Sequence, residues 1–187
     1  MTGPRPGEPL TYPLAGLLRE GSGAVRAYRV SGVTVDVGPD LQLADPIEWT
    51  VRVSRTNRGV IVHGRLGTAI ASQCSRCLRD IEVPLSLEIE EEALPSIDME
   101  TGQPLDWPGE SDVVRLTSAH ELELDVVVRE AIQLAEPIAP LCRPDCPGLC
   151  PDCGEDLADY PHVHEEEIDP RLEVLRAFRV DGNAGTH

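Results

Sequence analysis

Alternating apolar and polar residues in the first half of the chain predict β-strands. The stretch IEWTVRV (residues 47–53) places apolar side chains on one face and polar side chains on the other. The stretch RDIEVPLSLEIE (residues 79–90) alternates in the same way. A period of two residues is typical of a half-buried strand, because successive side chains point to opposite faces of a sheet. Pro84 falls on the polar face and indicates an edge strand or a bulge, because proline cannot donate a ladder hydrogen bond.

One or two helical turns are expected between Leu14 and Arg19, and the longer helical patterns lie in the second half of the chain. We expect Asp125 to cap a helix whose apolar stripe ends before Pro137. A second helix is expected to begin at Asp169 and Pro170, which supply a carboxylate N-cap and a proline at the first helical position. The apolar stripe of this second helix favours a role in core packing or docking.

These elements together predict an α+β fold. Consecutive strands with short connections favour a mainly antiparallel sheet that is small and curled or barrel-like, with a few short helices and a C-terminal zinc-knuckle segment. We expect a β-rich body with an N-terminal tail at 1–135. A Cys-rich zinc-binding segment and C-terminal helix at 136–187 would pack on it, which gives one domain overall. A chain of 187 residues is long enough for a single core of this kind.

The amino-acid composition limits which partners the protein can have and indicates its cellular compartment. Apolar residues make up 41% of the chain, as in folded proteins, and the net charge is −17. Such an acidic surface repels phosphate backbones at long range, which argues against generic coating of nucleic acid. No window is long and apolar enough for a membrane helix, and the N-terminus lacks the apolar stretch of a secretory signal. We therefore expect a cytoplasmic protein without a membrane partner, whose clustered cysteines bind metal instead of forming disulfides.

The stretch LCRPDCPGLCPDCG (residues 141–154) is the strongest chemical motif. Cys150 and Cys153 are spaced as in a zinc knuckle, in which two thiolates straddle a tight turn closed by glycine. The preferred ligand set for Zn²⁺ is the local one, since it closes the smallest loops. That set is Cys142, Cys146, Cys150 and Cys153.

Other ligands remain open, because four cysteines in this spacing are crowded for one tetrahedral ion. His162 or His164 could combine with the cysteines of the run, and the remote pair Cys74 and Cys77 lies where a turn would join two strands. Eight ligands could also form two sites. A fully ligated zinc has no open position for water and would be structural.

No catalytic constellation or phosphate-binding glycine motif is present in the sequence, so we expect neither an enzyme nor a small-molecule substrate. The rival hypothesis is a cytoplasmic redox or rubredoxin-like electron-transfer protein that uses the cysteine cluster. Leu78 stands where a glycine would follow Cys77, and the scarcity of aromatic residues also weakens an iron site. The predicted antiparallel strands beside the cysteine pair do not favour a thioredoxin-like centre, which opens a helix beside a parallel sheet.

The order of four segments resembles the YceD family, the large ribosomal RNA subunit accumulation proteins. These segments are CSRCLRDIEVPL, ELDVVVREAIQLAEPIAPLC, GLCPDCGEDL and DPRLEVL. The resemblance extends from about residue 30 to 179 and is weakest between Leu94 and Glu110. Many members carry a C-x-C pair where this chain has His162 and His164, and imidazole can replace thiolate at zinc.

The resemblance implies a ribosome-biogenesis factor that supports accumulation or processing of 23S rRNA. Its partner would be the precursor of the large ribosomal subunit, contacted through 23S rRNA, basic ribosomal proteins or both. A local basic strip is a candidate for that contact, and an ordinary solvated sheet edge is the alternative. The strip consists of Arg52, Arg55, Arg58, Arg65, Arg76 and Arg79.

Overall fold

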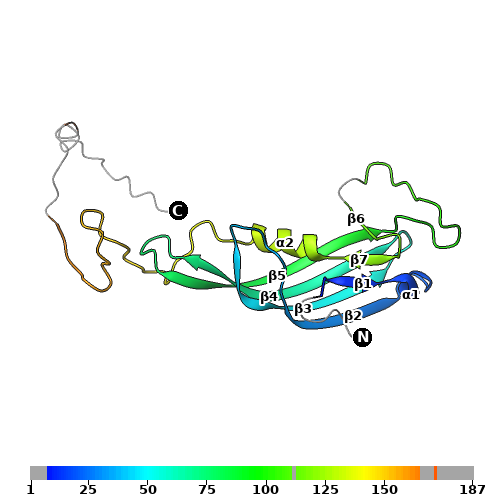
Figure 1. Cartoon of the computed structure of the whole chain (residues 1–187), viewed down its shortest axis with the longest axis horizontal. Coiled ribbons are helices and arrows are strands. Elements are labelled where there is room, and N and C mark those ends of the chain that lie inside the picture. Colours follow the sequence, from blue (N-terminus) through cyan, green and yellow to red (C-terminus); the bar gives the residue numbers. More distant parts are fainter. Residues whose placement is uncertain (1–7, 111–112, 165–170, 172–187) are drawn as a thin grey trace, which may run out of the picture.

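The alternating runs form the long strands of one sheet (Figure 1). The computed structural model describes residues 8–110, 113–164 and 171. A five-stranded sheet has the order β2-β3-β4-β5-β6, and β1 pairs with β7 in a separate two-stranded sheet. The elements are β1 (Thr11–Pro13), α1 (Ala15–Leu18), β2 (Val25–Val33), β3 (Gln42–Arg55), β4 (Val60–Gln73), β5 (Asp80–Leu94), β6 (Val114–Arg115), β7 (Glu121–Glu123) and α2 (Asp125–Leu134).

The large sheet is mainly antiparallel, as predicted, and two short helices accompany it within the described residues. Only β6 runs parallel to its neighbour, where Ala93 and Leu94 pair with Val114 and Arg115. The predicted closure into a barrel-like body was wrong for the described residues, since β2 and β6 are open edges. The sheet need not close, because α1, α2 and the β1–β7 pair contribute the other half of the core.

The core lies between one face of the sheet and these short elements. Buried and exposed side chains alternate along β3 from Ile47 to Val53, as the sequence pattern predicts. Trp49 is the largest fully buried residue, and its Nε1 donates to the Tyr12 hydroxyl at 2.9 Å. Gly64 on β4 makes room for the indole, because a Cβ there would lie 2.0 Å from the ring. This contact fixes β1 against the centre of the sheet.

Helix α2 begins at Asp125 and buries Val128 and Ile132. The prediction that Asp125 caps this helix was wrong, because Leu124 is the N-cap and no side chain bonds the free N–H groups there. The Asp125 carboxylate instead accepts a hydrogen bond from the N–H of Leu10 at 3.0 Å. It therefore ties the chain entering β1 to the start of the helix.

The sheet gives the molecule an elongated shape with different features at its two ends (Figure 1). At one end the β4–β5 turn meets the segment that follows α2 and carries the C-terminal cysteines. The loop between β5 and β6 lies at the other end. Pro84 lies on β5, which pairs with β4 along its length but with β6 only at its last two residues. At Pro84 the outer side of β5 is therefore an edge of the sheet, as predicted, and β6 extends the sheet only beyond it.

Two further expectations concern the C-terminus and membranes. The helix predicted to begin at Asp169 and Pro170 lies outside the described residues. Within the described part of the chain, no helix combines the length and apolar character needed to cross a membrane.

Candidate metal centre

The turn between β4 and β5 is a knuckle formed by Cys74 and Cys77. The N–H of Cys74 donates to the carbonyl of Arg79 at 2.8 Å, and the N–H of Leu78 donates to the carbonyl of Cys74 at 2.9 Å. The backbone N–H of Cys77 is directed at the sulfur of Cys74 and is the main cause that lowers the pKa of this thiol to about 6. A hydrogen bond of this kind favours the thiolate, which is the form that binds metal.

Cys150 and Cys153 form a second knuckle with the same backbone hydrogen bonds. The N–H of Cys150 donates to the carbonyl of Glu155 at 2.7 Å, and the N–H of Gly154 donates to the carbonyl of Cys150 at 2.9 Å. The N–H of Cys153 likewise lowers the pKa of Cys150 to about 6. The residue after each knuckle has a left-handed backbone, with φ of 78° at Gly154 and 58° at Leu78. CSRC therefore adopts the knuckle without the glycine that this position favours.

Cys142 and Cys146 approach the first knuckle and complete a four-cysteine site. All four sulfurs lie within 4.8 Å of one another. The Sγ–Sγ distance is 3.8 Å between Cys74 and Cys146 and 3.7 Å between Cys77 and Cys142. A disulfide would need about 2.05 Å, and all six cysteines of the chain are free. Sulfurs placed about 2.3 Å from a tetrahedral zinc lie roughly 3.8 Å apart, so this donor set fits zinc.

The four-cysteine site is largely shielded from solvent. Of its ligands only Cys142 is exposed. The side chains that pack against the site are Ile81, Leu141 and Leu149. Hydrogen bonding to Cys146, together with partial desolvation of the sulfur among the other thiols, raises the pKa of Cys142 to about 12. Four thiols this close cannot all ionise without a counter-charge, and a divalent cation would supply that charge.

Cys150 and Cys153 form a Cys2His2 site with His162 and His164, whose ligand atoms also lie within 4.8 Å of one another. Nδ1 of His162 is 2.7 Å from the carbonyl oxygen of Tyr160, a distance that fits donation by Nδ1–H. This contact leaves Nε2, at 3.1 Å from the Cys153 sulfur, free to bind a metal. The same hydrogen bond is the main cause that raises the pKa of His162 above 6.5.

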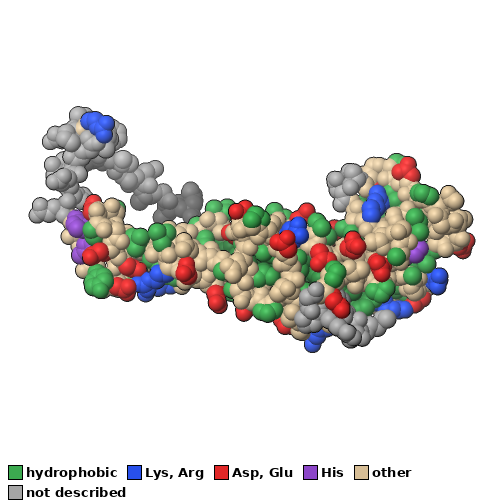
Figure 2. All heavy atoms as spheres, in the orientation of Figure 1, with side chains coloured by type: hydrophobic (Ala, Val, Ile, Leu, Met, Phe, Trp, Pro, Cys, Tyr) green, Lys and Arg blue, Asp and Glu red, His purple; other side chains and the backbone are tan. Residues whose placement is uncertain are grey.

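The Cys2His2 site is more open than the four-cysteine site. Cys150 is buried, His162 is partly exposed, and both Cys153 and His164 are exposed. Figure 2 shows histidine side chains on the surface at the end of the molecule that carries the cysteines. The two imidazoles meet edge to face with ring centroids 4.9 Å apart. Solvent and chelators can therefore reach this site directly.

The two sites are joined through the β4–β5 turn. The N–H of Leu149 donates to the carbonyl of Arg76 at 3.0 Å. The guanidinium of Arg76 donates to the carbonyl of Cys146 at 2.8 Å. Arg79 forms an ion pair with Asp156 at 2.8 Å. The segment that carries the Cys2His2 site is thus held against the turn that carries half of the four-cysteine site.

The structure distributes the predicted ligands differently from the preferred local set. Cys142 and Cys146 lie with Cys74 and Cys77, whereas Cys150 and Cys153 lie with the two histidines. Both groups use only residues that the sequence singled out, in the two-site arrangement left open there. Each group offers four donors, which saturate a tetrahedral ion. Their chemistry is that of structural metal sites, without an open position for a substrate.

Arg55, Arg76 and Arg79, from the predicted basic strip, have partners within the protein. Arg55 donates to the carbonyls of Thr56 and Gly59, the latter at 2.8 Å, and so holds the β3–β4 turn. Arg76 and Arg79 belong to the joint between the two metal sites. Their positive charges are therefore used to shape the protein.

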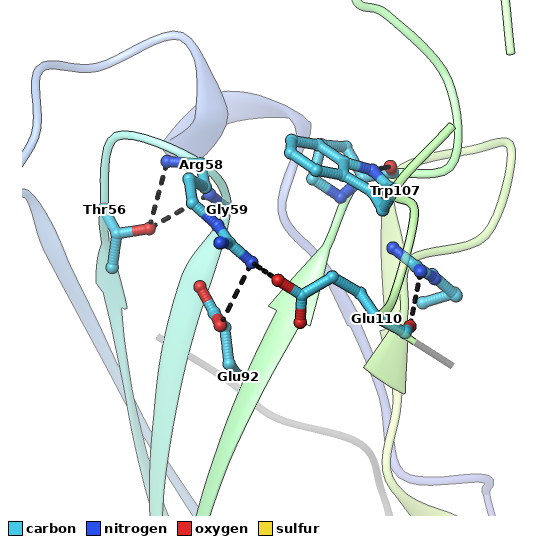
Figure 3. Close-up of polar contacts among 8 residues, drawn as sticks. Thr56, Arg58, Gly59, Glu92, Trp107 and Glu110 are labelled. Carbon is cyan, nitrogen blue, oxygen red and sulfur yellow. Dashed lines mark hydrogen bonds and ion pairs between the residues drawn. The ribbon is translucent and has the colours of Figure 1, made fainter. Parts of the chain in front are cut away.

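Arg58 is also committed to an internal network (Figure 3). Its guanidinium lies 2.8 Å from the carboxylate of Glu110 and 3.5 Å from that of Glu92. It also lies over the ring of Trp107, 5.6 Å from the centroid. These contacts fasten the β5–β6 loop to the β3–β4 turn.

Arg52 and Arg65 differ from the other four, because both point outward from the uncovered face of the sheet. Arg65 pairs with Glu88 at 3.0 Å. Arg52 makes no ion pair in the part of the chain that the structure describes. Sequence reasoning missed Arg29 on β2, which lies across from Thr50 on this face. The missing signal was the pairing of β2 with β3, which residue spacing alone does not give.

Comparison with known proteins gives a consistent assignment. A family model described as "Large ribosomal RNA subunit accumulation protein YceD" matches residues 62–179. Uncharacterized proteins of Mycobacterium tuberculosis and Mycobacterium bovis are each 30% identical over 170 residues, which covers 89% of this chain and 80% of theirs. A Mycobacterium leprae protein is 29% identical over 126 residues, covering 67% of this chain and 55% of its own. No solved structure matches the chain.

The family match spans every residue of the two candidate metal sites, from Cys74 to His164. It also spans β5 and nearly all of β4, the strands joined by the first knuckle. It covers more than half of the chain. This protein belongs to the YceD family of large ribosomal RNA subunit accumulation proteins.

Proposed function

We propose that this protein is a non-catalytic ribosome-biogenesis factor that acts in the cytoplasm and supports accumulation of 23S rRNA. The observation that carries the proposal is the family match over residues 62–179. In this proposal the protein binds precursors of the large subunit through rRNA or basic ribosomal proteins. Its two metal sites are structural and contain zinc.

The zinc assignment rests on the donor sets and their spacing. Thiolate and imidazole are the ligands that zinc favours in closed tetrahedral sites. The two sulfur–sulfur distances of the four-cysteine site match the edge of such a tetrahedron. Bound zinc would fix the Cys-bearing segment to the end of the sheet, and its binding free energy would add to folding stability.

Sedimentation tests the ribosomal part of the proposal. A tagged copy of the protein should migrate with precursors of the large subunit when an extract of its host is fractionated on a sucrose gradient. Depletion of the protein should lower 23S rRNA relative to 16S rRNA. If the protein stays in the light fractions and rRNA levels do not change on depletion, the proposal is wrong.

Metal analysis tests the structural part and separates it from the redox alternative. The purified protein should be colourless and contain two zinc ions per chain, as the two groups of four donors require. Mild oxidation should leave the loaded protein folded. Visible absorption from bound iron, or a reversible thiol–disulfide couple, would support an electron-transfer or redox protein instead.

A further inference from the structure

The face of the sheet opposite the core carries a hollow of about 790 Å³. It lies over β3, β4 and β5, and most of the side chains that line it are polar or charged. They include Thr50, Arg52, Ser54, His63, Arg65 and Glu88. In the described part of the chain no helix or strand covers these positions, and Arg52, His63 and Arg65 are exposed.

Strand register brings the arginines of this face and His63 together. Arg52 on β3 lies directly across from His63 on β4, and Thr50 lies across from Arg65. Arg29 on β2 follows in the same row as Thr50 and Arg65. Paired positions on neighbouring strands lie about 5 Å apart, and the next row along a strand lies about 7 Å away. Four residues distant in the sequence therefore form one compact basic patch.

The carboxylates of Glu88 and Glu90 on β5 also line the hollow and offset part of the charge of this patch. Arg65 pairs with Glu88 at 3.0 Å, and His63 lies 3.6 Å from Glu90. Arg29 and Arg52 make no ion pair within the described residues. Arg29 and Arg52, which occupy diagonal positions on neighbouring strands, thus carry guanidinium groups without an ion pair in a protein whose net charge is −17.

We propose that this hollow and the adjoining part of β2 bind the phosphate backbone of RNA, with Arg52 in the lining of the hollow and Arg29 beside it on β2 as the main anchors. Arginine binds phosphate oxygens with two parallel charge-assisted hydrogen bonds, and hydroxyls such as Thr50 and Ser54 add neutral ones. The residues that line the hollow include no Phe, Tyr or Trp, and their one ring is the small imidazole of His63, so the hollow offers bases little surface on which to stack. Recognition is therefore of the backbone and not of the base sequence.

The charge distribution favours RNA over a basic protein segment at this place. A lysine- or arginine-rich tail would meet the unpaired guanidinium groups of Arg29 and Arg52 and be repelled. An anionic polymer is repelled by most of the acidic surface but attracted here, so the patch limits where and how the RNA lies. The inference rests on the proposed ribosomal function and names RNA as the contact within it.

Binding of a fluorescent uridine oligonucleotide, followed by anisotropy at low salt, tests the site. Arg52→Glu should weaken binding about tenfold or more, because one charge-assisted contact is lost and a repulsive charge is introduced. It should also reduce the slope of log affinity against log salt by about 0.7. The matched control is Arg19→Glu, which changes the net charge equally at the end of α1, an element that covers the core face. Equal weakening by both substitutions, or no effect of Arg52→Glu, overturns the proposal.

A second pair of variants tests for tighter RNA binding. These variants remove a negative charge, so the fold does not have to tolerate a reversed charge. Glu88→Gln releases Arg65 from its ion pair and should tighten RNA binding several-fold. Glu123→Gln removes the same charge from β7, away from the open face, and should change affinity by less than about twofold because distant surface charges are screened. No difference between the two variants contradicts the proposed location. Zinc content and melting temperature should match the wild type in every variant compared.

Gradient sedimentation of the same variants separates this inference from the proposed function. Wild type and Arg19→Glu should migrate with large-subunit precursors, and Arg52→Glu should shift to lighter fractions. If Arg52→Glu still migrates with precursors and binds purified ribosomal proteins, the contact is protein and the RNA inference is wrong while the ribosomal function stands. If the wild type binds RNA in vitro but never migrates with precursors, the ribosomal function is wrong.

Discussion

The two candidate metal sites share a knuckle but differ in what they connect. The four-cysteine site joins a turn between two strands of the sheet to a segment about 70 residues later in the chain, as the 72-residue separation of Cys74 and Cys146 shows. The Cys2His2 site takes all its ligands from residues 150–164. The first is mostly buried, whereas two of the four ligands of the second are exposed. Similar knuckles therefore connect distant parts of the chain in the four-cysteine site and close a short segment in the Cys2His2 site.

The difference lies in the loop that each metal would close. Closing a long loop removes more freedom from the unfolded chain than closing a short one. The four-cysteine site also positions Arg76 and Arg79, on which the second site rests. We therefore expect a hierarchy in which the Cys2His2 site depends on the four-cysteine site and not the reverse.

Removal of a ligand from the four-cysteine site should have the largest effect. Cys74→Ser should reduce zinc content from two ions per chain to less than one and lower the free energy of unfolding by roughly 3 kcal/mol or more. Both sites should lose zinc, because the β4–β5 turn that supports the Cys2His2 site is no longer held in place. Zinc analysis and thermal melting measure this, with Ser75→Ala in the same turn as the control. Full zinc content and unaltered melting in Cys74→Ser would mean that this group does not bind metal.

Removal of a ligand from the Cys2His2 site should have a smaller, local effect. Cys153→Ser should leave about one zinc ion per chain and change the stability of the sheet by less than about 1 kcal/mol, since this segment makes few contacts with the core. Hydrogen exchange should accelerate in residues 148–164 and remain slow in β3 and β4. Loss of both ions from Cys153→Ser would reverse the proposed hierarchy.

Acidification should distinguish the sites by their ligands. Metal binds His162 only when Nε2 is unprotonated, so protons compete with the ion below the pKa of this imidazole. The hydrogen bond to Tyr160 raises that pKa, so competition begins at a higher pH than for an ordinary histidine. Zinc should leave the Cys2His2 site as the pH falls through this range, with the loss steepening below the pKa. The control is Cys153→Ser, which retains only the four-cysteine zinc. Protons compete for the thiolates of this site too, because thiols have a higher ordinary pKa than imidazole, but the site is mostly buried and we expect it to release zinc at a lower pH than the Cys2His2 site.

The strands were predictable because each buries only one face. The alternation in residues 47–53 and 79–90 reflects that burial directly. Sheet closure was not predictable, since it depends on the short elements that pack against the apolar face. The role of Asp125 was likewise missed, because its hydrogen bond to Leu10 joins residues 115 positions apart.

All eight possible metal ligands were recognisable from residue type and spacing, but their division between two sites was not. Loop length alone favours the local cysteines of residues 142–153. The structure instead brings Cys74 and Cys77 to Cys142 and Cys146 because the β4–β5 turn extends to the end of the sheet. The arginines show the same limitation. Sequence spacing groups six of them, whereas the strands place Arg52 and Arg65 on the open face, where Arg65 pairs with Glu88.

The residues that follow the two knuckles differ in how well they fit the same backbone conformation. Leu78 and Gly154 both have positive φ, but only glycine adopts this backbone without strain. Leu78→Gly should therefore stabilise the zinc-loaded protein by up to about 1 kcal/mol, since released strain exceeds the added freedom of the unfolded chain. Gly154→Ala should destabilise its segment by about 1 kcal/mol through backbone strain alone, because no atom lies within 4 Å of the added Cβ.

The rate of zinc release to a chelator measures the effect of these two substitutions on each metal site separately. We expect a fast phase of release from the exposed Cys2His2 site and a slow phase from the mostly buried four-cysteine site. Leu78→Gly should reduce the rate of the slow phase and leave the fast phase unchanged. Gly154→Ala should accelerate only the fast phase. The Cys2His2 site depends on the four-cysteine site for its position, but the four-cysteine site does not depend on the Cys2His2 site. If Gly154→Ala accelerated both phases equally, the two sites would form one cooperative unit and the difference in their burial would have no energetic consequence.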